Sequence, residues 1–127
     1  MNSNGKVRVL LAEDFLPIVE RVRRILERDG FDVVGTVNNG RDAITEVLRL
    51  NPDVLVTDIS MPIMNGLEAA RQLRDLNGRI KIVILTQHTE KHFVTAALSA
   101  GGSAYVMKSR FARDLVPAIR EAIEVQA

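Results

Sequence analysis

The sequence contains no cysteine and no tryptophan, and it has no long hydrophobic run. Without cysteine the chain can form no disulfide framework, no thiol nucleophile and no cysteine-based zinc site. The longest apolar runs span four residues, as at 9–12 and 82–85, and are too short to cross a membrane. Because the first residues also lack the apolar stretch of a secretory signal, we expect a soluble cytoplasmic protein with no membrane association.

The chain also has almost no net charge and few aromatic residues. The 17 basic and 16 acidic side chains leave a net charge of +1, and only 4% of the residues are aromatic. We therefore expect no direct nucleic-acid binding by this chain. The arginine cluster at 21–28 is accompanied by Glu20 and Glu27, which favours a solvated helix face over a partner-binding patch.

The remaining composition is that of one globular domain. With 127 residues, 46% of them hydrophobic and 26% charged, the chain is long enough to bury its own core. It contains no linker and no low-complexity tract, so we predict a single domain over residues 1–127.

Short β-rich runs alternate along the chain with longer segments of helical periodicity. The predicted strands cover residues 7–12, 32–37, 54–57, 81–86 and 104–107. The predicted helices cover residues 17–29, 41–50, 66–77, about 90–100 and about 112–125. These successive strand–helix units predict an α/β fold, in which five helices cover both faces of a doubly wound, five-stranded parallel sheet.

Two helix starts carry local signals. Asn65, three residues before Glu68, has the pattern of a helix N-cap. The last predicted helix contains Pro117, which cannot donate a backbone hydrogen bond. The first four N–H groups of a helix have no intrahelical partner, so a helix start near Arg113 would place this proline where it is tolerated.

Chemistry in an open parallel sheet lies beyond the carboxyl ends of the strands. Four of the five predicted strands lead there into charged or hydroxyl side chains, which are Glu13 with Asp14, Asp58, Thr86 and Lys108. Two like charges roughly 4 Å apart repel by about 4 kcal/mol at an effective dielectric constant of about 20. A hard divalent cation such as Mg²⁺ would remove this repulsion among the three carboxylates, so the sequence predicts a magnesium site.

The other two residues suit phosphoryl transfer. Lys108 offers a point charge for a phosphoryl oxygen, and Thr86 offers a hydroxyl donor. Asp58 stands at the centre, and a carboxylate can act as a nucleophile to form an aspartyl phosphate. The glycine-rich phosphate loops of nucleotide-binding proteins are missing, which argues against a nucleotide-dependent enzyme.

With these residues in place, the chain resembles the receiver domain of two-component response regulators over residues 6–125. The resemblance is carried by Leu11–Asp14, Val56–Gly66, Leu85–Thr86 and Ala104–Lys108. The stretches 61–66 and 105–109 are most similar to receivers of LuxR/NarL-type transcription regulators. The resemblance implies a CheY-like, flavodoxin-like fold with strand order 2-1-3-4-5. It also implies a signalling switch rather than an enzyme, with only weak self-phosphorylation and autodephosphorylation chemistry.

The resemblance implies roles for the acidic residues. Asp58 would accept a phosphoryl group from the phosphohistidine of a sensor histidine kinase. Asp14 and Asp58 would bind Mg²⁺ directly, and Glu13 would bind it through a water molecule. The main-chain carbonyl of Ser60 would complete the protein ligands.

The resemblance also implies how the signal leaves the site. Lys108 would hold one phosphoryl oxygen and Thr86 another, and Tyr105 would then turn inward. This motion would remodel the surface of the fourth helix, fifth strand and fifth helix, which would control an output DNA-binding domain or partner protein, or a homodimer. Kinase choice is expected on the first helix and on the loop after the fifth strand.

Two positions depart from the family pattern. The acidic pair, often Asp-Asp, is Glu13-Asp14 here, and the longer glutamate can still reach a metal-bound water. The lysine is often followed by a cis proline, which is replaced here by Ser109. Because a cis bond before serine costs about 2.5–4 kcal/mol, the geometry of the Lys108–Ser109 bond stays open, and with it the placement of Lys108.

Other functions stay open beside the switch. A Mg²⁺-dependent phosphohydrolase would need a second carboxylate two residues after Asp58, where Ser60 stands, so its turnover would be slow. A degenerate interaction module would lack some family positions, and all are occupied. His88 is read as a surface loop residue, with the hypothesis that it and Ser60 tune the phosphate lifetime.

The output is the last open question. LuxR-type regulators carry a DNA-binding domain after the receiver, whereas this chain ends at Ala127. We expect an isolated receiver whose output is transcription, and a stand-alone regulator acting by protein–protein binding is the alternative.

Overall fold

The computed structural model describes residues 5–87, 95–96 and 98–124 of the chain. Its strands and helices are β1 (Arg8–Ala12), α1 (Leu16–Arg28), β2 (Asp32–Val37), α2 (Gly40–Leu50), β3 (Val54–Asp58), α3 (Gly66–Leu76), β4 (Lys81–Thr86), β5 (Ala104–Met107) and α5 (Phe111–Glu124). Among these described residues, no helix combines the length and the hydrophobicity that a bilayer crossing requires.

The five predicted strands are confirmed, as are four helices, each within one or two residues of its predicted bounds. The described part of the chain therefore has four α-helices with defined bounds, not the five that were predicted. The predicted helix at about 90–100 lies largely outside the described residues, although residues 95–96 and 98–99 are helical.

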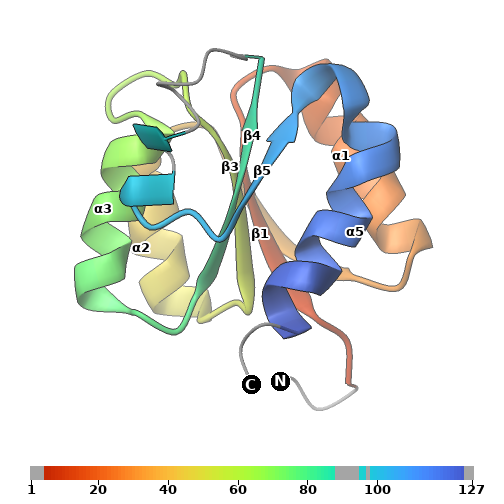
Figure 1. Ribbon diagram of the computed structural model, residues 1–127, viewed down its shortest axis with the longest axis horizontal. Helices are drawn as coiled ribbons and strands as arrows, with labels where there is room; N and C mark the ends of the chain where they lie inside the picture. Colours follow the sequence, from red (N-terminus) through yellow and green to blue (C-terminus); the bar gives the residue numbers. More distant parts are fainter. Residues whose placement is uncertain (1–4, 88–94, 97, 125–127) are drawn as a thin grey trace.

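The strands form one parallel sheet in the order β2-β1-β3-β4-β5, as the sequence resemblance implied. Helices α1 and α5 cover one face of the sheet, and α2 and α3 cover the other (Figure 1). The chain reverses its direction of strand addition between β1 and β3, and such a switch point leaves a crevice at the carboxyl ends of the two strands.

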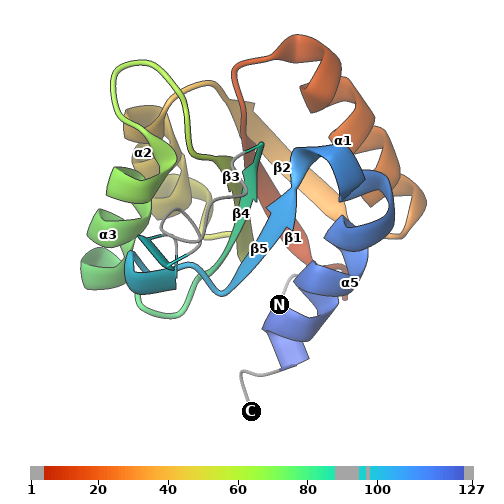
Figure 2. The ribbon, with the colours of Figure 1, turned by 45° about the horizontal axis from the view of Figure 1, so that its top comes forward.

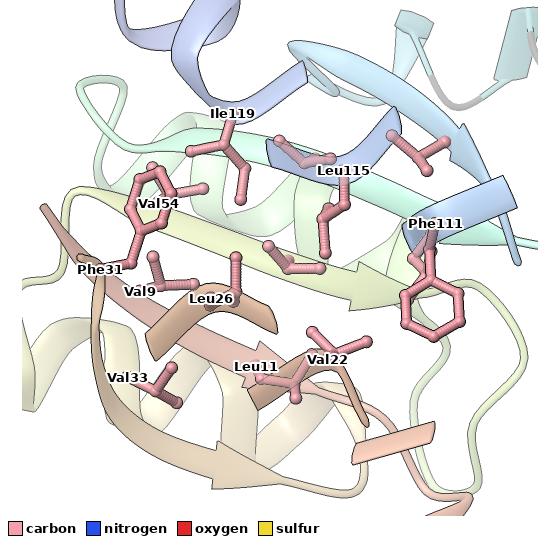
Figure 3. Close-up of a cluster of buried hydrophobic side chains, with 14 of the residues drawn as sticks. Val9, Leu11, Val22, Leu26, Phe31, Val33, Val54, Phe111, Leu115 and Ile119 are labelled. Atoms are coloured by element: carbon pink, nitrogen blue, oxygen red, sulfur yellow. The ribbon is translucent and has the colours of Figure 1, made fainter. Parts of the chain in front are cut away.

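The core consists of two hydrophobic layers, one on each face of the sheet. Val9 and Leu11 of β1 belong to the layer under α1 and α5, which Figure 3 shows. Leu10 and Ala12 belong to the layer under α2 and α3. All four side chains are fully buried. Because alternate residues point into different layers and both layers are dry, the strand is continuously apolar rather than alternating.

The start of α5 bears on the position of Pro117. The helix begins at Phe111, one residue before the predicted start, so Pro117 lies inside the helix, and the start near Arg113 that would accommodate the proline is not adopted. Phe111 is only 3% exposed. Full burial of such a side chain contributes about 1.5–3 kcal/mol, which is comparable to the roughly 3 kcal/mol that a proline costs in a helix interior. The hydrophobic anchor therefore sets the helix start.

The start of α3 follows its prediction. The Asn65 side chain accepts a hydrogen bond from the backbone N–H of Glu68 at 2.9 Å, which makes it the N-cap. Helix α3 thus begins at Gly66, directly after the loop that leaves the carboxyl end of β3.

Candidate functional site

Three carboxylates meet at the carboxyl ends of β1 and β3. The sheet register pairs Ala12 with Thr57, so the following residues, Glu13 and Asp58, lie side by side. Carboxylate oxygens of Glu13, Asp14 and Asp58 all lie within 4.8 Å of one another. Glu13 and Asp58 are buried, whereas Asp14 is exposed. The segments that follow β1 and β3 leave the sheet at this same end (Figure 2).

Lys108 extends into this cluster from the end of β5. Its Nζ lies 2.8 Å from Oε1 of Glu13 and donates a hydrogen bond of 3.0 Å to Oδ2 of Asp58. The contact with Glu13 is an ion pair without hydrogen-bond geometry, because Oε1 accepts no hydrogen bond from the described residues. Oε2 of Glu13 accepts a hydrogen bond of 3.0 Å from the backbone N–H of Phe15.

The pKa values of the paired groups reflect burial and charge together. Burial raises the pKa of Glu13, and the contacts with Lys108 and the Phe15 N–H offset only part of this rise. Burial by itself would lower the pKa of Lys108, but the close contacts with the carboxylates of Glu13 and Asp58 outweigh it and raise that pKa. Lys108 is therefore a permanent cation that holds two buried carboxylates together near neutral pH.

The position of Lys108 does not depend on a cis bond. The Lys108–Ser109 bond is trans, as are all described peptide bonds, and Lys108 still reaches both carboxylates. Lys108 opens a 3₁₀ turn that leads directly into the buried Phe111. The guanidinium carbon of Arg21 on α1 lies 4.9 Å from the centre of the Phe111 ring. One member of the predicted arginine cluster thus packs on the segment that carries Lys108.

Backbone hydrogen bonds from two glycines hold the loop between β3 and α3 in place. Gly66 N–H donates to the Ile59 carbonyl at 2.9 Å, and a Cβ on Gly66 would overlap the carbonyl oxygen of Asp58. Gly40 N–H donates to the Met64 carbonyl at 2.7 Å, and a Cβ there would lie 2.5 Å from that oxygen. The close contacts of Gly66 and Gly40 were not predicted, because close backbone approach leaves no signal in a single sequence.

The remaining predicted site residues lie around the cluster. Thr86 ends β4, is fully buried and stands on the strand next to that of Asp58. Tyr105 is the second residue of β5, half-buried, and packs on the hydrophobic layer under α2 and α3. Ser60 is exposed in the loop after β3. His88 lies outside the described residues. The backbone N–H of Phe15 was not identified from the sequence, since a main-chain donor has no residue signature.

Comparison with known proteins agrees with this geometry. Residues 9–120 match the response regulator receiver domain family, and the chain belongs to that family. It is therefore a receiver domain of a two-component response regulator, and its relatives include regulators of transcription.

Particular relatives locate the chain within the family. It is 35% identical to the transcriptional regulatory protein DegU of Brevibacillus brevis over 119 residues, which is 93% of this chain and 50% of DegU. It is 36% identical to the response regulator UvrY of Escherichia coli K12 over 115 residues, 90% of this chain and 53% of UvrY. A LuxR-family response regulator from Aurantimonas sp. superposes with a TM-score of 0.90 at 33% identity, covering 95% of this chain and 87% of that one. The chain thus spans about half the length of these two curated relatives.

Proposed function

We propose that this receiver is a phosphorylation-dependent switch in which Asp58 accepts a phosphoryl group from a sensor histidine kinase. The observation that carries the proposal is the buried Asp58 carboxylate, which Lys108 contacts at 3.0 Å within a cluster of three carboxylates. A structural ion pair needs one acid and one base. The additional acids, Glu13 and Asp14, add negative charge beyond what Lys108 alone neutralises, and a cationic ligand would relieve their mutual repulsion.

The transfer itself is a displacement at phosphorus. Oδ2 of Asp58 accepts a hydrogen bond from Lys108. Oδ1 accepts none from the described residues, and we assign it as the nucleophilic atom. As the Asp58 O–P bond forms, the P–N bond of the phosphohistidine breaks and the imidazole leaves with its electron pair. Asp58 loses its negative charge as this bond forms, and Lys108 would move to a phosphoryl oxygen, whose negative charge it would offset.

The residues of the site fit Mg²⁺. All three side chains are hard oxygen donors, and Oε1 of Glu13 is buried without a hydrogen bond from the described residues. Asp14 and Asp58 would bind the ion directly, Glu13 would act through a water molecule, and the Ser60 carbonyl would complete the set. When bound, the ion would neutralise the carboxylates and the incoming phosphoryl oxygens. The exposed Asp14 leaves the solvent side open for it.

The same site argues for a signal rather than for turnover. Receiver domains are in general signalling proteins and not enzymes. In this chain a phosphohydrolase would need an acid two residues after Asp58, and the exposed Ser60 stands there instead. We therefore assign only self-phosphorylation and slow autodephosphorylation to the site.

The signal would leave the site through β4 and β5. Thr86, buried at the end of β4, would bond a phosphoryl oxygen, and Tyr105 would follow by turning inward. This movement would remodel the surface of the fourth helix, β5 and α5, and so control a partner, an output domain or a homodimer in the cytoplasm. Because the related regulators act on transcription, we infer transcription as the output, through a DNA-binding domain outside residues 1–127. A regulator that acts through protein–protein binding alone is the second candidate.

Acyl-phosphate chemistry provides the test. The protein would be labelled with a small acyl phosphate in Mg²⁺ and treated with hydroxylamine, which converts an aspartyl phosphate to a hydroxamate. We expect the hydroxamate at Asp58 in a peptide map. Label that survives hydroxylamine, or a hydroxamate at Asp14 or Glu13, would contradict the assignment.

The tyrosine content allows a direct test of the switch. Tyr105 is the only tyrosine in a chain without tryptophan, so intrinsic tyrosine fluorescence reports on this residue alone. We expect phosphorylation, or Mg²⁺ with beryllium fluoride, to change that emission in the wild type and not in Thr86→Ala. An unchanged emission in phosphorylated wild type would argue against the inward turn of Tyr105.

A further inference from the structure

The Asn–Gly dipeptide occurs four times in the chain, at Asn4, Asn39, Asn65 and Asn77. In this dipeptide the backbone nitrogen after the asparagine can attack the side-chain amide carbon, because glycine places no side chain in its way. The reaction needs a free backbone N–H and a local chain that can bend. The three pairs that the structure describes differ in hydrogen bonding and in exposure.

Two of these pairs lie at helix starts and are held by hydrogen bonds. The first of them is Asn39–Gly40, at the start of α2. Oδ1 of Asn39 accepts the backbone N–H of Asp42 at 2.9 Å, as N-cap of α2. The N–H of Gly40 is donated to the Met64 carbonyl at 2.7 Å. Asn39 is 3% exposed. The nucleophilic N–H of this pair is therefore held in another bond, and the asparagine side chain is buried.

The second pair is held in the same way. Oδ1 of Asn65 accepts the backbone N–H of Glu68 at 2.9 Å, and the N–H of Gly66 is donated to the Ile59 carbonyl at 2.9 Å. Gly66 is also buried. Ring closure at Asn65 would require the first turn of α3 to open.

The third pair, at the junction between α3 and β4, is not restrained in this way. Gly78 is exposed, and its N–H makes no hydrogen bond within the described residues. Asn77 is only half-buried, and its Oδ1 accepts the backbone N–H of Arg79 at 3.2 Å. The amide oxygens of Asn39 and Asn65 accept backbone N–H groups as well, so this bond does not distinguish Asn77. The difference lies in the nucleophile, because only the N–H of Gly78 is free among the three described pairs.

We propose that Asn77 is a site of spontaneous covalent modification, in which the chain converts it to aspartate and isoaspartate. The Gly78 nitrogen attacks Cγ of Asn77, the new N–C bond forms, and the Gly78 amide proton passes to water. The Cγ–Nδ2 bond then breaks while Nδ2 takes up a proton from water, and ammonia leaves, which yields a cyclic imide. Water adds to one of the two imide carbonyls and opens the ring, so no oxidant or cofactor is needed.

The aspartyl and isoaspartyl products would alter the segment between α3 and β4. This modification is separate from the proposed phosphorylation switch. Each product adds a carboxylate beside Arg79. The isoaspartyl product also adds one carbon to the main chain between α3 and β4. Asn77 N–H donates to the Leu73 carbonyl at 2.7 Å, and the buried Ile80 follows at the edge of the core. The longer backbone would shift one of these two anchors, so we expect a lower thermal midpoint in the isoaspartyl form.

The chain offers a matched control for the test. Among the described residues other than its two chain neighbours, the nearest atom to a Cβ on Gly78 would be the Arg74 carbonyl oxygen at 3.6 Å, and the residue is outside the left-handed region. Gly78→Ala should therefore fold normally while its methyl group hinders attack by the nitrogen. This substitution separates the chemistry of the dipeptide from the structure of the loop.

The experiment is peptide mapping of the folded protein during incubation at mildly alkaline pH, with Asn39, Asn65 and Asn77 followed together. We expect conversion at Asn77 to be at least about tenfold faster than at the other two, and to fall by a similar factor in Gly78→Ala. In concentrated urea the three rates should converge, because the helix caps are lost. Equal rates in the folded protein, or an Asn77 rate that Gly78→Ala leaves unchanged, would overturn the proposal. The status of Asp58 as phosphoacceptor has no bearing on these outcomes.

Discussion

At the scale of single residues, Lys108 does most to hold the site together. Its Nζ contacts the carboxylates of Glu13 and Asp58, whose side chains are 0% and 7% exposed. Without that cation two buried negative charges would face each other with no described partner of opposite charge. The stability of the domain and the chemistry of the site therefore depend on the same ammonium group.

Lys108→Met should lower the free energy of unfolding by roughly 2–3 kcal/mol at neutral pH. This is somewhat less than the loss of a partner from a fully buried ion pair, since Lys108 keeps some solvent exposure. Urea denaturation of both proteins provides the measurement. Addition of Mg²⁺ should narrow the difference, because the ion would supply the missing positive charge; a difference that grows with Mg²⁺ would contradict this account.

The pH dependence of that difference follows from the raised pKa of Lys108. A cation whose pKa is higher in the folded state contributes stability that is complete below its ordinary value of 10.5. The contribution is lost as the pH rises through the folded-state pKa. The gap between wild type and Lys108→Met should thus be constant from neutral to mildly alkaline pH and shrink above 10.5. If the difference in unfolding free energy instead grew above that pH, the ion pairs of Lys108 would not be what stabilises the wild type.

A second residue-scale feature is strain beside the site. Ile63 has a φ of 69°, is 73% exposed and is the centre of a tight turn in which Met64 N–H donates to the Pro62 carbonyl at 2.7 Å. A β-branched residue in this left-handed region is disfavoured. Ile63→Gly should therefore stabilise the domain by roughly 1–2 kcal/mol in urea denaturation. Ile63→Val retains the branch and serves as the control, which should unfold with the wild type.

At the scale of elements, the β3–α3 loop depends on close backbone approach. Gly66→Ala should destabilise the protein by about 1–3 kcal/mol, since the new methyl group meets the Asp58 carbonyl and cannot be accommodated by a side-chain shift. The loop movement should also slow phosphorylation by a small acyl phosphate. Gly78→Ala, at the other end of α3, should do neither. Equal stability of the two variants would mean that the loop adapts freely.

Helices α1 and α5 meet through Arg21 and the Phe111 ring, and this contact lies three residues from Lys108. Arg21→Ala should cost about 0.5–1 kcal/mol of stability and slow phosphorylation by a small acyl phosphate. Arg23, which pairs with Glu27 at 3.8 Å on the exposed side of the same helix, is the control. If Arg23→Ala reduced the rate as much as Arg21→Ala, loss of charge on α1 and not the ring contact would be the cause.

The elements themselves could be predicted well from the sequence. Continuous apolar strands, helical periodicity and the Asn65 cap placed nearly every described boundary, because local chemistry decides them. The placement of Pro117 inside α5 could not be predicted, because it depends on burial of Phe111 in a core that forms only after folding. The contact of Arg21 with the Phe111 ring was missed for the same reason, since it also forms only when the two helices pack together.

At the scale of the whole molecule, the sheet order brings distant residues to one edge. Glu13, Asp58 and Lys108 are separated by 45 and 50 positions and still meet within hydrogen-bonding distance, because parallel strands end on the same side. Their convergence could be predicted from strand ends alone. Distances, the supporting Phe15 N–H and the Gly40 contact could not, since these depend on the packing of loops.

The central claim is that Asp58 is the phosphoacceptor, and intact mass measurement tests it most directly. Wild type, Asp58→Asn and Asp53→Asn would be incubated with a small acyl phosphate, each with Mg²⁺ and with a chelator. Asp53 is the matched control, because it accepts the Arg8 N–H at 2.8 Å at the opposite end of β3. The account predicts a gain of one phosphoryl group in wild type and Asp53→Asn, only with Mg²⁺, and none in Asp58→Asn. A phosphoryl gain in folded Asp58→Asn equal to that of the wild type would contradict it.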